Sequence, residues 1–304
     1  IKQKGTTFIS VFGLACAVGC CMVAYLFIAQ IWFKGLNQPN KDEIYQLTYT
    51  AEGENGLVTY GSVAEPISEL IPEKLSQVQN QTRVQLEFPI LIHNNESYQQ
   101  RSIYVDPAFM EMFTYRMDYG FSGALKDQSQ VILTQELSEK LFGETHPIGQ
   151  ELALVVDGEE KLYKVGGVLA NLNDMDMFNF DLLVNFESHP YIMTDMSLED
   201  EWNSELWTFI QLEKGQNLAD LNAGLQVLTE GQNQVNPNKP YLNMGLVAYT
   251  DLIYKVDEIE NGVRDFLGLG PQILLGSIGL FILILAVFNY INISVLMASR
   301  RLKE

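Results

Sequence analysis

Side chains that could do chemistry are present in this sequence, but their spacing matches no catalytic or metal site. Zinc sites combine histidine with cysteine or place two histidines four residues apart, and His93, His146 and His189 have neither kind of partner. The acidic run at residues 199–201 predicts a solvated loop or helix start rather than a Ca²⁺ site. No nucleophile–base pair and no glycine-rich phosphate loop is recognisable. We therefore expect no catalytic residue, cofactor or metal in this chain, and no direct binding of ATP.

Two long apolar runs without a charged side chain, residues 8–33 and 266–299, enclose the rest of the chain. About 20 apolar residues in a helix cross the hydrocarbon core of a bilayer, so each run can span it. The first run is too long for a cleaved signal peptide, and it ends in Trp32 and Phe33, which suit a membrane interface. We expect transmembrane helices at residues 8–33 and 271–299, the second long enough to continue out of the membrane as a stalk.

Basic residues flank these runs on the sides of the chain ends: Lys2, Lys4, Arg300, Arg301 and Lys303. Cytoplasmic flanks of membrane helices are enriched in lysine and arginine. We therefore expect residues 1–7 and 300–304 to be cytoplasmic, and residues 34–270 to form one large extracytoplasmic domain.

The charge distribution excludes nucleic acid as a partner. The net charge is −19, and all but one of the 38 acidic residues lie between the two apolar runs. A phosphate backbone requires a basic surface, which this segment lacks. The three cysteines, Cys16, Cys20 and Cys21, all fall inside the first run, so the extracytoplasmic segment is not a disulfide scaffold.

The hydrophobic pattern predicts an α+β extracytoplasmic domain made of two β-α-β halves. The first half is a strand at 43–49, a helix capped by Ser62 with Pro66 in its first turn, and a strand at 84–92 that is edge-placed or bulged because of Pro89. The second half is a strand at 207–212, a helix at 218–228 and a strand at 242–249. We expect the halves (34–98 and 204–262) to form one subdomain, with residues 99–203 inserted between them as a β-rich subdomain.

The insertion carries its own turn signals. Thr134 is placed to cap a short helix that Gly143 ends, with Leu137 and Leu141 facing the core. Asp157-Gly158 between strands at 151–156 and 161–168 predicts a hairpin.

A motif spans residues 105–152: an Asp-Pro before an aromatic-rich helix, then a Leu-Phe-Gly and a Pro-Ile-Gly. Its residues are Asp106, Pro107, Leu141, Phe142, Gly143, Pro147, Ile148 and Gly149. This segment resembles the periplasmic core domain of macrolide-exporter (MacB-like) and FtsX-like ABC transporter permeases. The opening resembles the first helix of the permeases common in Bacteroidetes-type bacteria, and residues 281–304 are similar to the second membrane helix and the start of the coupling segment.

The resemblance implies a permease subunit, or its first half, in a bacterial inner membrane. It implies an ABC ATPase partner that binds ATP and Mg, a second permease half or protomer, and an adaptor or substrate protein in the periplasm. Efflux, export, and lipoprotein or peptide handling all remain open. The alternative is a two-helix receptor, a chemoreceptor or sensor kinase, which shares the topology but lacks the motif; the sequence after Glu304 would distinguish them.

Polar and small residues in the apolar runs are candidates for helix packing and coupling. Asn289 and Asn292 lie three residues apart on one helix face and are costly to expose to lipid. Gly13 and Ala17 allow close approach of a second helix. Arg300 and Arg301 begin the expected coupling segment. Packing within one protomer is the open alternative to a role in coupling.

Overall fold

The computed structural model describes residues 2–54, 56–156, 158–170, 172, 176–189, 202–263 and 268–301. The acidic run at 199–201, Asp157 and Lys303 lie outside the described residues. The chain divides into two compact units, each described by itself below: a helix pair (Ile1–Lys34 with Phe266–Glu304) and a central unit (Gly35–Asp265).

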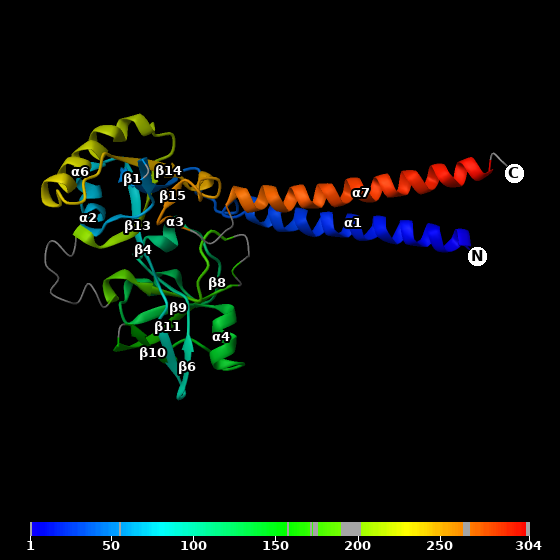
Figure 1. The fold of residues 1–304 in the computed structure, drawn as a ribbon. Helices are drawn as coiled ribbons and strands as arrows, with labels where there is room; N and C mark the ends of the chain where they lie inside the picture. Colours follow the sequence, from blue (N-terminus) through cyan, green and yellow to red (C-terminus); the bar gives the residue numbers. More distant parts are fainter. Residues whose placement is uncertain are drawn as a thin grey trace. The chain divides into compact units, whose positions relative to one another are not determined.

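Two long helices, α1 (Lys2–Trp32) and α7 (Leu269–Arg301), form the helix pair (Figure 1). They contain apolar segments long enough to cross a membrane, Val11–Trp32 and Leu269–Val295. These segments agree with the expected spans at 8–33 and 271–299. Each helix is hydrophobic and largely exposed around its circumference, as expected where lipid replaces water.

The interface between α1 and α7 follows a repeat of alternating three- and four-residue steps. Buried or half-buried residues at this spacing are Leu14, Ala17, Cys21, Ala24, Ile28 and Ile31 on α1, and Gln272, Gly276, Gly279, Leu283 and Ala286 on α7. This is the spacing of a coiled-coil interface. Gly279 lies against Cys21 and Ala24, and the Cys21 thiol donates to the Gly279 carbonyl at 3.0 Å. Small residues therefore bring the two backbones together.

The central unit has two halves, and the first, which we call the α/β half, is a sheet covered by two helices. Its elements are β1 (Ile44–Gly53), β2 (Gly56–Tyr60), β3 (Val63–Ala64), α2 (Glu65–Lys74), β4 (Val78–Glu87), β13 (Glu205–Leu212), η4 (Leu218–Leu221), α6 (Asn222–Val235) and β14 (Asn243–Ala248). Four strands lie in the order β14-β1-β13-β4, each antiparallel to its neighbour. Each β-α-β crossover thus encloses a strand of the other half, the split β-α-β arrangement.

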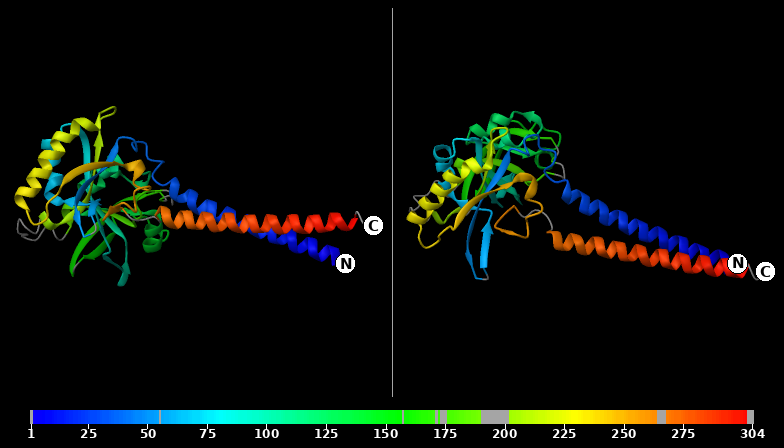
Figure 2. Two further views of the ribbon diagram at one scale, coloured as in Figure 1. Left: turned by 45° about the horizontal axis from the view of Figure 1, so that its top comes forward. Right: turned by 90° about the horizontal axis from the view of Figure 1, so that it is seen from above.

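The helices α2 and α6 pack against each other and against this sheet (Figure 1). Their buried residues, such as Ile67 on α2 and Leu225 on α6, share one core with Leu47 and Ile210 of the strands. The β1–β2 hairpin extends beyond the rest of the sheet (Figure 2, right). The expectation of a mixed α/β domain between two apolar helices is confirmed.

The second half of the central unit is formed by the residues between β4 and β13 in sequence. Its elements are β5 (Ile90–His93), β6 (Glu96–Gln99), β7 (Ser102–Val105), α3 (Phe109–Met112), β8 (Met117–Gly120), η1 (Ser122–Lys126), β9 (Gln130–Thr134), α4 (Gln135–Phe142), β10 (Glu151–Val156), β11 (Glu159–Leu169), β12 (Leu182–Asn185) and η2 (Phe186–Ser188). The sheet continues from β4 through β7, β12, β9, β11 and β10 to the β5–β6 hairpin. Strand β4 pairs with β13 on one side and β7 on the other, so it belongs to both halves.

The segment that follows β14 returns to the sheet of the first half. It contains η5 (Tyr249–Asp251) and the short strand β15 (Ile259–Glu260), which pairs in parallel with β2. The fully buried Tyr249 ring packs at 5.5 Å from that of Phe113.

The structure tests the expected helix caps and the expected hairpin. Thr134 caps α4 by accepting from the Leu137 amide at 3.3 Å, Gly143 ends the helix at φ 58°, and β10 and β11 form the expected hairpin. The cap at Ser62 is wrong: α2 begins only at Glu65, because Val63 and Ala64 are held extended in β3 by pairing with β13, and the Ser62 hydroxyl donates to Glu205.

Two further expectations need correction. The single strand at 84–92 is wrong, since it is divided into β4 and β5 around Phe88 and Pro89, where proline has no amide to donate. Leu218 does not lie on the buried face of a helix: it is 39% exposed in the η4 turn, and α6 starts only at Asn222.

Candidate functional site

The described part of the chain contains no group of three or more His, Cys, Asp or Glu placed to hold a metal. His93 is half-buried with its Nδ1 3.1 Å from the Glu151 carbonyl, and the exposed His146 packs edge-on against Tyr119. His189 is buried beside Glu87 at 3.2 Å. Each of the three histidines thus contacts different residues of the fold.

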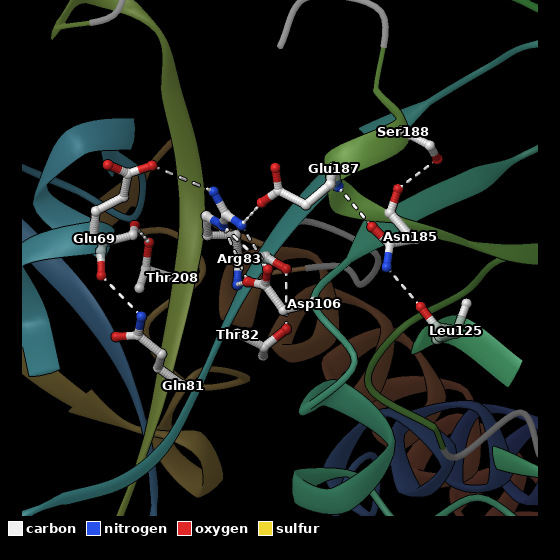
Figure 3. Close-up of polar contacts among 11 residues, drawn as sticks. Glu69, Gln81, Thr82, Arg83, Asp106, Leu125, Asn185, Glu187, Ser188 and Thr208 are labelled. Atoms are coloured by element: carbon white, nitrogen blue, oxygen red, sulfur yellow. Dashed lines mark hydrogen bonds and ion pairs between the residues drawn. The ribbon is translucent and has the colours of Figure 1, made fainter. Parts of the chain in front are cut away.

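The main polar cluster of the central unit is centred on Arg83, in β4 (Figure 3). Asp106 follows β7 directly, and the pairing of Val84 with Val105 brings it beside Arg83. The Arg83 guanidinium donates from Nη2 to Oδ1 at 2.7 Å and from Nε to Oδ2 at 3.1 Å, while its backbone amide donates to Oδ2 at 2.6 Å. Asp106 is the first motif residue, and its role here is to hold β4.

Arg83 reaches two further elements. Its Nη2 donates to the Glu187 carboxylate in η2, and its Nη1 lies 3.9 Å from Glu69 Oε1 on α2. Its guanidinium carbon lies 4.0 Å from the centre of the Phe186 ring. We call Arg83, Asp106, Glu187 and Glu69 the Arg83 cluster; it connects α2 and β4 of the first half with β7 and η2 of the second.

The electrostatics of the cluster keep the arginine charged. Its side chain is only 12% exposed, and burial alone would lower the pKa of Arg83. The hydrogen bonds and charges of Asp106, and then of Glu187, outweigh burial and raise the pKa of Arg83 above its ordinary value. Charge-assisted, bidentate contacts of this kind fix orientation as well as add stability.

Short hydrogen bonds continue from the cluster on both sides (Figure 3). Towards α2, the Gln81 side chain donates to the Ser68 carbonyl at 2.9 Å, and the buried Ser68 and Thr208 hydroxyls lie 2.7 Å apart. Towards η1, the Asn185 side chain accepts from the Glu187 amide at 2.8 Å and donates to the Leu125 carbonyl at 2.6 Å. The shared strand β4 is therefore held by side-chain contacts in both halves.

The other motif residues build the turns around α4. Gly143 and Gly149 have φ of 58° and 83°, values that L side chains rarely adopt. Pro147 is buried and Pro107 half-buried. The half-buried apolar residues Leu141, Phe142 and Ile148 pack against the core of the second half. The motif thus forms structural framework rather than a chemical site.

Of the residues expected to pack helices together, one lies in the α1–α7 interface and three are exposed on the surface of the helix pair. Ala17 is 3% exposed in the α1–α7 interface. Gly13, Asn289 and Asn292 lie on the outer surface of the pair. Arg300 and Arg301 are the last helical residues of α7.

Several contacts were not expected from the sequence. At the C-terminal end of α1, the Trp32 indole donates to Gln272 near the start of α7 at 2.6 Å; the three- and four-residue repeat could have revealed the α1–α7 interface. The Arg83 contacts could not have been found in this way, because Asp106 and Glu187 are 23 and 104 residues away. Glu205, a polar centre in the first half, was missed for the same reason.

The chain is similar to known proteins in both sequence and fold. The model of the MacB-like periplasmic core domain family matches residues 7–228. A permease-protein domain from Porphyromonas gingivalis is 18% identical, with a TM-score of 0.58 over 70% of this chain and 92% of that one. That likeness shows the fold. No curated protein matches the sequence.

Two transporter domains are also similar in structure. The periplasmic region of MacB from Actinobacillus actinomycetemcomitans is 12% identical, with a TM-score of 0.48 over 71% of this chain and 94% of that one. The extracellular domain of the noncanonical ABC-type transporter YknZ from Gram-positive bacteria is 14% identical, with a TM-score of 0.46 over 67% and 99%.

Proposed function

The chain belongs to the family of MacB-like periplasmic core domains, and we propose that it is part of a permease subunit of an ABC transporter in a bacterial inner membrane. Its role would be to couple ATP hydrolysis by a partner ATPase to movement of the periplasmic unit in efflux, export, or lipoprotein or peptide handling. The observation that carries this proposal is the extent of the family match, which includes most of α1 and most of the central unit.

The proposed mechanism is mechanical. The partner ATPase binds ATP and Mg, and its dimerisation moves the coupling segment that begins near Arg300 and Arg301. The helix α7 runs without interruption from Leu269 to Arg301, so a displacement at one end can reach the other. The small residues at the α1–α7 interface support joint movement of the two helices. Within the central unit, the Arg83 cluster supports movement of both halves as one body.

A further membrane helix fits the outer surface of the helix pair. Asn289 and Asn292 are exposed there, within the apolar segment Leu269–Val295. A side-chain amide facing hydrocarbon is unfavourable unless it finds a hydrogen-bond partner. We propose that a second permease half or protomer supplies this partner. The receptor alternative has no comparable support from the family match.

The test uses the complete transporter in lipid nanodiscs with its ATPase. Spin labels are attached to cysteines replacing Gln30 on α1 and Glu136 on α4, in a background without the three native cysteines. ATP should shift the distance distribution between the labels, and a hydrolysis-deficient ATPase should trap one state. A second pair at Glu73 and Glu136, both in the central unit, should shift much less. If the ATPase binds but ATP does not shift the distance between the labels at Gln30 and Glu136, the coupling mechanism is refuted. If no ABC ATPase co-purifies with the chain, the transporter proposal is refuted.

A further inference from the structure

A hollow of about 430 Å³ opens in the α/β half of the central unit, where β1 and β2 face the loop that precedes β14. This volume lies in the ~300–1,000 Å³ range of small-molecule sites. Its lining includes the rings of Tyr49 and Tyr60 and several polar side chains: Glu52, Glu205, Asn238, Lys239 and Asn261. None of these residues belongs to the family motif or to the Arg83 cluster. We call it the Tyr60 hollow.

A stack of three tyrosines forms one wall of the Tyr60 hollow. The Tyr49 ring lies between those of Tyr60 and Tyr241, at centroid distances of 4.9 and 3.7 Å and with interplanar angles of 18° and 7°. Tyr49 and Tyr241 are fully buried, whereas Tyr60 is half-exposed and lines the hollow. Tyr60 is therefore a rigid aromatic platform held by the core behind it.

The Glu205 carboxylate lines the Tyr60 hollow and accepts three hydrogen bonds there. Its carboxylate accepts from the Tyr49 hydroxyl at 2.7 Å, the Ser62 hydroxyl at 2.9 Å and the Lys239 ammonium at 2.5 Å. The Glu205 side chain is only 11% exposed, whereas that of Lys239 is 40% exposed. An ammonium group has three N–H donors, so Lys239 can bind Glu205 and still donate to a ligand.

A second hollow, of about 270 Å³, adjoins the first and shares Glu205 and Asn261 with it. Trp207 and Gln85 are among its lining residues, so it too combines an aromatic side chain with an amide. The Trp207 indole donates to the Asn261 carbonyl at 2.7 Å, which fixes the ring. We call it the Trp207 hollow. Two adjacent hollows, each with one fixed and partly exposed aromatic side chain (Tyr60 or Trp207), suit a ligand of two linked rings.

We propose that the two hollows bind successive rings of a neutral oligosaccharide. The apolar face of a sugar ring packs on an aromatic side chain, and its hydroxyls both donate and accept hydrogen bonds. The lining supplies the matching set: Lys239 and Asn238 donate, while Glu52 and Asn261 accept. An anionic ligand would meet Glu52 and Glu205, and a cationic one would meet Lys239. The proposal is independent of the transport mechanism above.

Binding is measured by titration calorimetry on the full chain, in a detergent without a sugar headgroup. The probes are maltose, cellobiose and N,N′-diacetylchitobiose, the monosaccharide unit of each, and glucosamine and glucuronate as charged comparisons. At least one neutral disaccharide should bind, and more tightly than its monosaccharide or either charged sugar. Binding of a charged sugar alone would overturn the neutral class, and absence of binding to all three disaccharides would overturn the site.

Variants of single residues test whether the disaccharide binds in the Tyr60 hollow. Tyr60→Ala should weaken the disaccharide by about five- to tenfold, the effect of one lost aromatic contact. Tyr254→Ala, which removes an exposed tyrosine outside both hollows, should leave binding unchanged. Because Tyr60 also stacks on Tyr49, Asn238→Ala on the exposed loop is the second test, and it too should weaken binding without altering the melting temperature. Undiminished binding in both Tyr60→Ala and Asn238→Ala would place the ligand elsewhere and refute the proposal.

Discussion

Replacing Asp106 with alanine tests whether the Arg83 cluster stabilises the central unit. The change removes the acceptor of three Arg83 groups: the backbone amide at 2.6 Å, Nε at 3.1 Å and Nη2 at 2.7 Å. The guanidinium would remain, 12% exposed, with one carboxylate fewer. A buried charge that loses its partner is destabilising because water cannot fully replace the lost contact.

The expected magnitude follows from the burial of the pair. Removing one partner of a fully buried ion pair costs about 3–5 kcal/mol. Asp106 is 18% exposed, so water offsets part of this cost. Glu187 still accepts from Arg83, and the Phe186 ring still lies 4.0 Å away. We therefore expect a loss of about 2–3 kcal/mol in the free energy of unfolding.

The assay is thermal and urea unfolding of the full chain in detergent, followed by near-UV circular dichroism. A loss of that size corresponds to a melting temperature about 4–12 °C lower for a unit of this size. Asp106→Asn keeps an acceptor for the Arg83 amide but removes the charge, so it should fall between wild type and alanine. The matched control is Glu151→Ala, which breaks a contact of 3.6 Å to Lys164 between side chains more than 60% exposed. That change should cost less than about 1 kcal/mol.

The reasoning is refuted if Asp106→Ala unfolds like Glu151→Ala. Arg83 would then be held by Glu187 and packing alone, and the contact between Arg83 and Asp106 would be a by-product of the strand pairing.

Three further predictions concern topology, coupling and pH. A cysteine replacing Glu96, in the exposed β5–β6 hairpin, should react in intact cells or spheroplasts with an impermeant thiol reagent, and one replacing Lys303 should be protected; the reverse pattern would invert the orientation. Asn292→Leu should leave expression and ATPase binding normal but reduce transport per ATP in the complete transporter, because an interhelical hydrogen bond of ~0.6–2 kcal/mol shifts a conformational equilibrium without preventing folding. Unchanged transport per ATP would give Asn292 a packing role only. Burial raises the pKa of Glu65 despite the opposing charge of Arg83, so its ionised form costs stability above the unfolded value of about 4.3. Glu65→Gln should therefore raise the urea midpoint at pH 7 and lose this advantage below about pH 4; an equal or lower midpoint at pH 7 would contradict the assignment.

Features encoded in short stretches of sequence were predictable. The two apolar runs predicted α1 and α7 because membrane helices need only length and composition. The Thr134 cap and the β10–β11 hairpin were predictable because each depends on neighbours within a few residues. The division of the central unit into subdomains with boundaries at 98/99 and 203/204 stays a prediction.

Features that depend on distant partners were not predictable. Ser62 has the side chain of a helix cap, but Glu205, 143 residues away, accepts its hydrogen bond. The segment 84–92 was expected to form one strand, edge-placed or bulged because of Pro89, yet β4 and β5 separate there and pair with different strands, such as β7 and β10. The interleaving of β1, β13, β4 and β14 likewise depends on tertiary packing, which overrides local pattern.

The family motif and the two hollows have different physical roles. Asp106 holds the shared strand β4, and Gly143 and Gly149 permit turns that other residues would strain. Any protein with this fold can use such residues, whatever it binds or moves. The aromatic and polar groups around Glu205 are not required by the backbone in the same way, since Tyr60 and Lys239 keep part of their surface exposed. The motif therefore identifies the framework, and ligand specificity is to be sought at half-exposed side chains such as Tyr60.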